Sequence, residues 1–115
     1  MYRFEKLRVY QNAVELVKTI YKITIELPND EKFALIDQLK RSAISVVLNI
    51  AEGSGGLGDK EYKSYLRNAL KSLYETIAAL KIAEQLFVVD VSKALLKCDS
   101  ISKELHSLIK SLNRE

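Results

Sequence analysis

Apolar residues recur at intervals of three and four along most of the chain, which is the spacing of an amphipathic α-helix. Three breaks interrupt the pattern, at Pro28-Asn29-Asp30, in the glycine-rich run 53–58 and near Asp90. The pattern therefore predicts four helices, over about residues 7–27, 31–52, 59–87 and 91–112. Because short breaks make successive helices antiparallel neighbours, we predict one all-α domain over residues 1–115, an antiparallel up-down four-helix bundle.

Residues at the breaks suggest where the helices begin and end. Asp30 and Asp59 are suitable N-caps for the second and third helices, and Asp90 or Ser92 is suitable for the fourth. We expect Gly53 to end the second helix in the left-handed conformation that glycine favours.

The first helix differs from the others in its apolar pattern. The third and fourth helices each carry one apolar stripe, whereas the first carries two adjacent stripes that together span roughly 200° of its surface. One stripe comprises Leu7, Tyr10, Val14, Val17, Tyr21 and Thr24, and the other comprises Val9, Ala13, Leu16, Ile20, Ile23 and Leu27. A surplus apolar face is typical of an interface. We therefore predict a homo-oligomer with a contact formed by Val9, Ala13, Leu16, Ile20 and Ile23. The alternative is that this helix is simply the most buried helix of a monomer.

Composition limits the compartment and the partners. Cys98 is the only cysteine, so no disulfide forms within the chain, and this suits a reducing cytoplasm. We expect a cytoplasmic protein without a membrane partner, because the N-terminus lacks the apolar run of a signal peptide and no stretch resembles a membrane span. The net charge of +3 permits a polyanionic partner without requiring one.

Residues that usually carry catalysis or metal binding are scarce. The only histidine, His106, has no metal-ligand pattern around it, and Cys98 falls within an apolar stripe, where a buried and inert thiol is expected. The glycine-rich break lacks the Gly-Lys-Ser/Thr of a phosphate-binding loop. We predict no catalytic residues, no metal site and no cofactor.

Small polar residues form a stripe on the second helix, opposite its apolar face. The stripe contains Gln38, Arg41, Ser42, Ser45, Asn49 and Glu52. Small hydroxyl and amide groups permit close approach of another helix or chain and hydrogen-bond across it, although a plain solvent-facing stripe is the alternative. We assign Arg41, Ser45, Asn49 and Glu52 to packing or interhelix hydrogen bonds. The candidate partners of Arg41 are Asp37, Glu52 and Glu75.

Cations form a second stripe, on the third helix. Lys60, Lys63, Arg67 and Lys71 lie within an arc of about 80°, with Tyr74 on the same side. Such a stripe can neutralise the phosphates of RNA or DNA, and an adjacent aromatic ring can stack on a base. A solubilising face with no ligand is the alternative.

Several sequence motifs resemble those of a known family. The most specific is Arg41-Ser42-Ala43-x-Ser45-x-x-x-Asn49-Ile50-Ala51-Glu52-Gly53. Further matches are Phe4-x-x-Leu7-x-Val9-Tyr10, Leu27-Pro28-x-x-Glu31-x-Phe33 and Ala69-Leu70-x-Ser72-Leu73-Tyr74-Glu75. The chain resembles the four-helix-bundle proteins encoded within intervening sequences of bacterial large-subunit ribosomal RNA genes. These in turn are similar to the accessory variability determinant proteins of diversity-generating retroelements.

The resemblance implies a homopentamer that associates with RNA or DNA through basic surface and has no known enzymatic activity. One departure is that family members often carry a basic residue in the glycine-rich break, where this chain has Gly56 or Leu57. Our leading hypothesis is a non-enzymatic homo-oligomer that binds nucleic acid through Lys60, Lys63, Arg67 and Lys71. The rival hypothesis is a protein–protein adaptor or scaffold without direct nucleic-acid contact.

Overall fold

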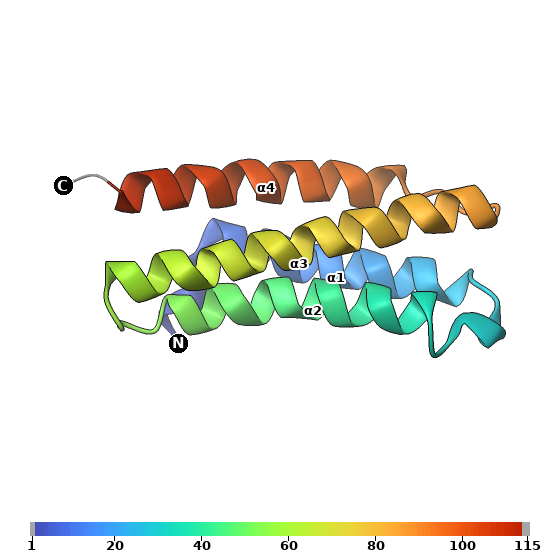
Figure 1. The fold of residues 1–115 in the computed structure, drawn as a ribbon, viewed down its shortest axis with the longest axis horizontal. Coiled ribbons are helices and arrows are strands. Elements are labelled where there is room, and N and C mark those ends of the chain that lie inside the picture. The colour runs from blue at the N-terminus through green and yellow to red at the C-terminus, as the bar shows by residue number, and fades with distance from the viewer. Residues whose placement is uncertain (1, 114–115) are drawn as a thin grey trace.

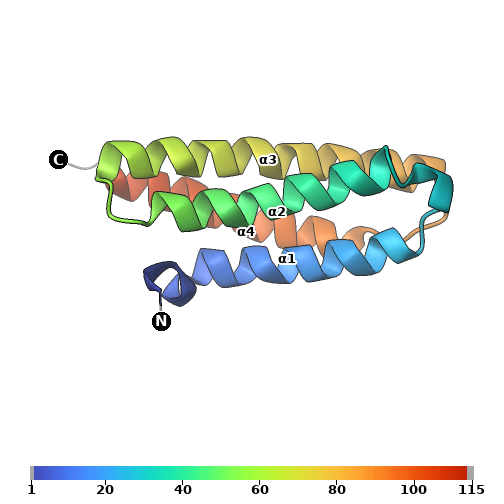
Figure 2. The same cartoon turned by 90° about the horizontal axis from the view of Figure 1, so that it is seen from below.

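The computed structural model describes residues 2–113, and this part of the chain forms four long helices packed as a bundle (Figure 1). The helices are α1 (Arg8–Ile25), α2 (Leu35–Gly53), α3 (Asp59–Leu86) and α4 (Ser92–Leu112), accompanied by short 3-10 turns at Arg3–Lys6 and Asn29–Glu31. The predicted all-α four-helix bundle is confirmed. Successive helices run in opposite directions along a body of 48 × 24 × 20 Å, as Figure 2 shows from a second side.

The core runs along the whole axis of the bundle and draws on all four helices. α1 packs on α2 and α4, and α3 packs on the same two helices. Leu16, Leu39, Leu73 and Ile101, one from each helix, are fully buried. The apolar stripes predicted for the third and fourth helices face inward, since most of their members are buried and the rest pack against the core.

The two apolar stripes of α1 lie in different environments, and the predicted oligomer contact is corrected on this point. Val9, Ala13, Leu16, Ile20 and Ile23 are between 0% and 5% exposed within the single chain. They are covered because α2 and α4 flank α1 and close over the stripe that points between them. These residues therefore belong to the core and are not free to contact another copy. The other stripe remains partly accessible, with Tyr10, Val14 and Val17 half-buried and Tyr21 exposed.

The second helix begins later than the sequence predicts. The residues after Pro28 form the short turn Asn29–Glu31, and α2 starts at Leu35, so Asp30 does not cap it. Lys32 explains the difference. It stands seven residues before the fully buried Leu39, so a helix continuing back from α2 would point its ammonium group toward the core. The turn instead leaves Lys32 exposed and brings Leu35 into the core.

The glycine-rich break also differs from expectation. Gly53 is the last residue of α2, and the glycines with positive φ are Gly56 and Gly58, at 88° and 102°. Gly53 is instead required by close packing, because an added Cβ would lie 2.7 Å from Cβ of Tyr65 on α3. The residue before α3 is Gly58, so Asp59 lies within the first turn and is not the N-cap.

The N-cap of α4 is Val91, which makes no side-chain cap hydrogen bond, so neither predicted candidate, Ser92 nor Asp90, holds that position, and Asp90 lies one residue before it. Asp90 Oδ1 accepts hydrogen bonds from the backbone N–H of Ser92 at 2.9 Å and from the Ser92 hydroxyl at 2.6 Å. These two bonds lower the pKa of the Asp90 carboxyl, so it stays ionised where the helix dipole favours a negative charge.

Replacing Gly53 with alanine tests the close approach of α2 and α3. Helix propensity alone predicts that Gly53→Ala stabilises the protein by about 0.5–1 kcal/mol. The contact with Tyr65 predicts the opposite, a loss of about 1–3 kcal/mol, because neither backbone can yield without disturbing the core. Urea denaturation followed by circular dichroism measures whether the free energy of unfolding rises or falls. A variant as stable as the parent would contradict the close contact.

Candidate nucleic-acid interface

The predicted basic stripe lies on the solvent side of α3. Lys60, Arg67 and Lys71 are exposed and Lys63 is half-buried. The opposite side of the helix enters the core through residues such as Leu66 and Leu73, so helix periodicity alone holds the cations outward. The stripe occupies the first half of α3, near the end of the bundle where α4 finishes (Figure 1).

The positive charge of this stripe is not neutralised by neighbouring side chains. Among residues 2–113, ion pairs form between Lys18 and Glu15 and between Lys81 and Glu84, and neither involves the stripe. Lys63 Nζ donates a hydrogen bond to the uncharged Asn113 Oδ1 at 2.9 Å, which ties the stripe to the end of α4. Four cations thus remain available to an anionic ligand.

Tyr74 extends the stripe toward α4. Its ring is 53% exposed, and its hydroxyl oxygen lies 3.4 Å from Nε2 of His106. The contact joins the exposed Tyr74 of α3 to His106 of α4. His106 itself is exposed, as expected.

The small polar residues of α2 do not form a ligand site, because they face α3. The Thr76 hydroxyl donates to Ser42 Oγ at 2.8 Å, and the Ser45 and Ser72 hydroxyls are also 2.8 Å apart. We call Ser42, Ser45, Ser72 and Thr76 the hydroxyl seam. The predicted interhelix hydrogen bond is therefore confirmed at Ser45, and Ser42 forms a second one with Thr76.

Of the two amides beside the hydroxyl seam, Gln38 bonds across to α3, whereas the hydrogen bonds of Asn49 stay within α2 and are not the predicted interhelix bonds. Asn49 Nδ2 donates to the backbone oxygen and the hydroxyl of Ser45, at 2.9 and 3.1 Å. Gln38 Nε2 donates to Glu75 Oε2 on α3 at 3.1 Å. Ser42, Ser45 and Asn49 belong to the most specific motif of the sequence, and Ser72 and Glu75 belong to another. Much of the motif pattern therefore serves the contact between these two helices.

Arg41 and Glu52 behave differently from the rest of that motif. Both are exposed, and neither takes part in the ion pairs recorded among the described residues. The predicted pairing of Arg41 with Asp37, Glu52 or Glu75 is absent from this part of the chain, and Glu75 instead accepts from Gln38. Because α2 turns these two residues to solvent, their packing assignment within the chain is wrong.

Two surfaces were missed by sequence reasoning. The first is an outer apolar face, in which the exposed stripe of α1 adjoins apolar residues of α2. We call it the α1–α2 face; it contains Tyr10, Val14, Val17, Tyr21, Ile36, Ile44, Val47 and Leu48. Lys40 Nζ of α2 lies 4.5 Å from the Tyr21 ring centroid, which places the two halves of this face side by side.

The second surface that sequence reasoning missed is a groove between α1 and α4, lined by lysines.

Cys98 is buried, as its place in an apolar stripe predicts. Burial raises the pKa of the Cys98 thiol to about 12, so the reactive thiolate is scarce at neutral pH. No cluster of His, Cys, Asp or Glu that could hold a metal ion occurs among residues 2–113. Within the same residues, no helix is both long and apolar enough to cross a membrane.

The fold defines an all-α four-helix-bundle protein whose third helix carries four cations that form no ion pair within residues 2–113. The chain belongs to the family described as 23S rRNA-intervening sequence protein, whose family model matches residues 5–113. The resemblance noted in the motifs is thereby confirmed over nearly the whole chain. A comparison with curated proteins finds no match.

A double-mutant cycle tests the hydroxyl seam. Ser45→Ala and Ser72→Ala should each cost about 1 kcal/mol of unfolding free energy, because each leaves a partly or fully buried hydroxyl without its partner. The double variant should lose less than the sum of the two, since the hydrogen bond can be lost only once. Ser64→Ala, at an exposed position of α3, is the matched control. Strict additivity in urea denaturation would show that the two hydroxyls do not interact.

Proposed function

We propose that this protein is a non-enzymatic homo-oligomer of the cytoplasm that binds the phosphodiester backbone of RNA or DNA. The observation that carries the proposal is the set of the exposed Lys60, Arg67 and Lys71 and the half-buried Lys63, none of which forms an ion pair with an acidic side chain of residues 2–113. Cations held at helical spacing neutralise phosphates without reading bases, so binding has little sequence preference. Tyr74 adds a surface on which an unpaired base can stack.

The geometry favours a polynucleotide over a small metabolite. The cations occupy the convex side of a single helix, and a small ligand is normally held in a concave and largely apolar pocket. An extended chain of phosphates matches a row of cations better. The family description concerns where such genes are encoded and is not itself a statement about binding.

We further propose that copies associate through the α1–α2 face. Its large apolar residues include Leu48, which is 52% exposed, and the half-buried Val14, Val17 and Ile44. A contiguous apolar surface of this kind is typical of protein interfaces. The family resemblance implies five subunits, and we adopt that number. Repeating the cation stripe around an oligomer raises affinity for a long polyanion through multivalency.

Charge reversal tests the binding surface. In the double variant Lys63→Glu/Arg67→Glu, the slope of log affinity against log salt should fall by about 0.7 per lost contact with single-stranded RNA. Fluorescence anisotropy of a labelled RNA oligonucleotide from 50 to 300 mM salt measures this slope. The matched control is Lys6→Glu/Lys32→Glu, which makes the same charge change at exposed positions outside α3.

The control variant separates a local effect from one of net charge. If both double variants weaken binding equally, the assignment to α3 is wrong. Salt-insensitive binding that survives nuclease treatment would favour the rival function of a protein–protein adaptor, for which the exposed Arg41, Leu48 and Glu52 of α2 offer surface.

A single substitution tests the proposed contact between copies. Leu48→Glu places a charge in the α1–α2 face and should reduce the mass in solution toward the 13.1 kDa of one chain. Leu86→Glu, at a position of α3 that is 63% exposed, makes the same chemical change elsewhere and should leave the mass unaltered. Light scattering after size exclusion measures both. A parent protein that is monomeric at micromolar concentration would reject self-association.

A further inference from the structure

A groove between the second half of α1 and the first turns of α4 gathers lysines from two walls. Its volume is about 500 Å³. Its lining comprises Glu15, Val17, Lys18, Thr19, Tyr21, Lys22, Lys93 and Lys97. A second hollow of about 320 Å³, which also reaches Leu96 and Ser100, shares Lys93 and Lys97 with it. We call the two together the α1–α4 groove. It lies at the end of the bundle where α1 finishes and α4 begins, away from the first turns of α3 (Figure 1).

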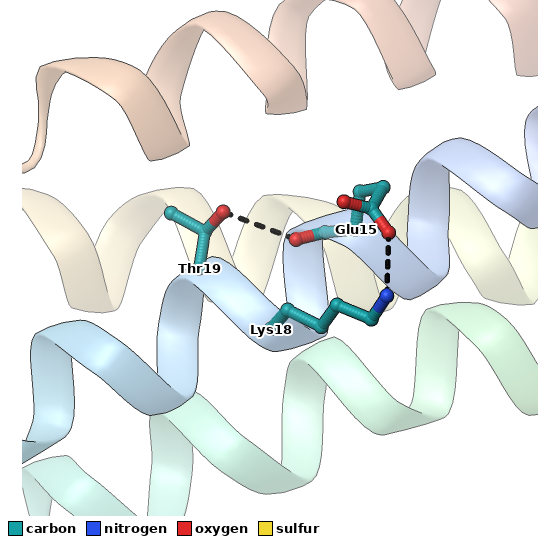
Figure 3. A network of polar contacts seen from close by, with 3 residues as sticks. All are labelled: Glu15, Lys18 and Thr19. Atoms are coloured by element: carbon teal, nitrogen blue, oxygen red, sulfur yellow. Dashed lines mark hydrogen bonds and ion pairs between the residues drawn. The ribbon is translucent and has the colours of Figure 1, made fainter.

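The charges in the groove do not balance. Lys18, Lys22, Lys93 and Lys97 face a single carboxylate, that of Glu15. Glu15 is already occupied, because Lys18 Nζ lies 2.9 Å from its Oε2 (Figure 3). The Lys18 hydrogen bond and charge lower the pKa of Glu15, and the charges of Lys97 and Lys22 lower it further. The field of both walls therefore reaches the same point, with an excess of three positive charges.

Two other polar side chains at the groove, Thr19 and Asn12, form hydrogen bonds within the protein. The Thr19 hydroxyl donates to the backbone oxygen of Glu15 at 3.0 Å (Figure 3). Asn12 Nδ2 donates to Glu104 Oε1 at 2.8 Å, which ties α1 to α4 beside the groove. At the start of α4, Asp90 Oδ1 accepts a hydrogen bond from the backbone N–H of Ser92. The lysines are consequently the groups left to meet a ligand.

The arrangement of these lysines suits a chain of phosphates. Lys18 and Lys22 are one helical turn apart on α1, and Lys93 and Lys97 are one turn apart on α4, so each pair is separated by about 6 Å along its helix. A chain lying in the groove meets cations on both sides.

We propose that the α1–α4 groove is a second binding site for a phosphodiester chain, and that its ligand is a single-stranded polynucleotide. The inference rests on the proposed function and extends it to a different surface at the other end of the bundle. Between the two sites, α4 carries Lys103 and Lys110 at exposed positions. One strand that occupies both sites passes over this helix.

Neutralising the groove tests the proposal. In Lys22→Gln/Lys97→Gln, the slope of log affinity against log salt for a labelled 20-nucleotide oligouridylate should fall by about 1.4, for two contacts with a single strand. Lys6→Gln/Lys32→Gln is the matched control and should keep the parent slope. Circular dichroism establishes that both variants remain folded. If the groove variant keeps the parent slope while Lys63→Glu/Arg67→Glu lowers it, α3 acts alone and the groove proposal is overturned.

A second probe separates this proposal from the proposed function. Tripolyphosphate should shift the amide resonances of Thr19 and of residues 93–100, and the groove variant should abolish those shifts. If the parent protein binds tripolyphosphate there but no oligouridylate, the phosphate site stands and nucleic-acid binding is rejected. If neither probe binds, or if poly-glutamate binds the groove as well as oligouridylate does, the proposal of a phosphodiester site is overturned.

Discussion

Close contact between α2 and α3 is the constraint on which the rest of the structure depends. Gly53 leaves no room for a side chain against Tyr65, and along the same interface hydroxyl groups meet at 2.8 Å. Small side chains let two helix backbones approach, and the paired hydroxyls satisfy one another where water is excluded. No buried side-chain polar atom of the described residues lacks a hydrogen-bond partner. The seam therefore fixes the rotation of both helices at little cost in desolvation.

That rotation determines what each surface can do. With Ser72 and Thr76 turned to α2, and Leu66 and Leu73 turned to the core, Lys60, Arg67 and Lys71 of α3 are left exposed, while Lys63 reaches Asn113 after α4. On α2 the same rotation places apolar side chains such as Val47 beside the outer stripe of α1, which creates the α1–α2 face. The packing of α2 on α3 thus determines the positions of both the basic stripe of α3 and the apolar α1–α2 face, which lie on different sides of the bundle. Self-association through the α1–α2 face leaves the cations of α3 accessible.

Much of the fold was predictable because its signals are local. The stripe of α4 has a single inward direction, so Cys98 and Ile101 could be assigned to the core from spacing alone. In α1 the two stripes have similar apolar composition, and only the positions of α2 and α4 decide that the one with Leu16 and Ile20 is covered. Periodicity gives the width of an apolar arc but not its orientation in the bundle.

The two candidate binding sites also differ in whether the sequence alone could reveal them. The α3 stripe lies on one helix and was visible in the sequence, whereas the α1–α4 groove joins Lys22 and Lys97, which are distant along the chain. The sequence does show two pairs of lysines, each with one-turn spacing, on the helices that become α1 and α4. It does not show that the fold brings these two pairs together. Likewise Gly53 suggested a left-handed cap, and its actual role depends on Tyr65 of another helix.

The central claim is that a polynucleotide lies on the side of the bundle formed by α3 and α4 and on the groove beside α1. Photo-crosslinking of the intact protein to an oligonucleotide containing 4-thiouridine, followed by peptide mapping, tests it most directly. We predict crosslinks in the peptides that contain residues 60–74 and in those that contain residues 93–97. Crosslinks confined to α2, or none at concentrations where RNA is bound, would contradict the account.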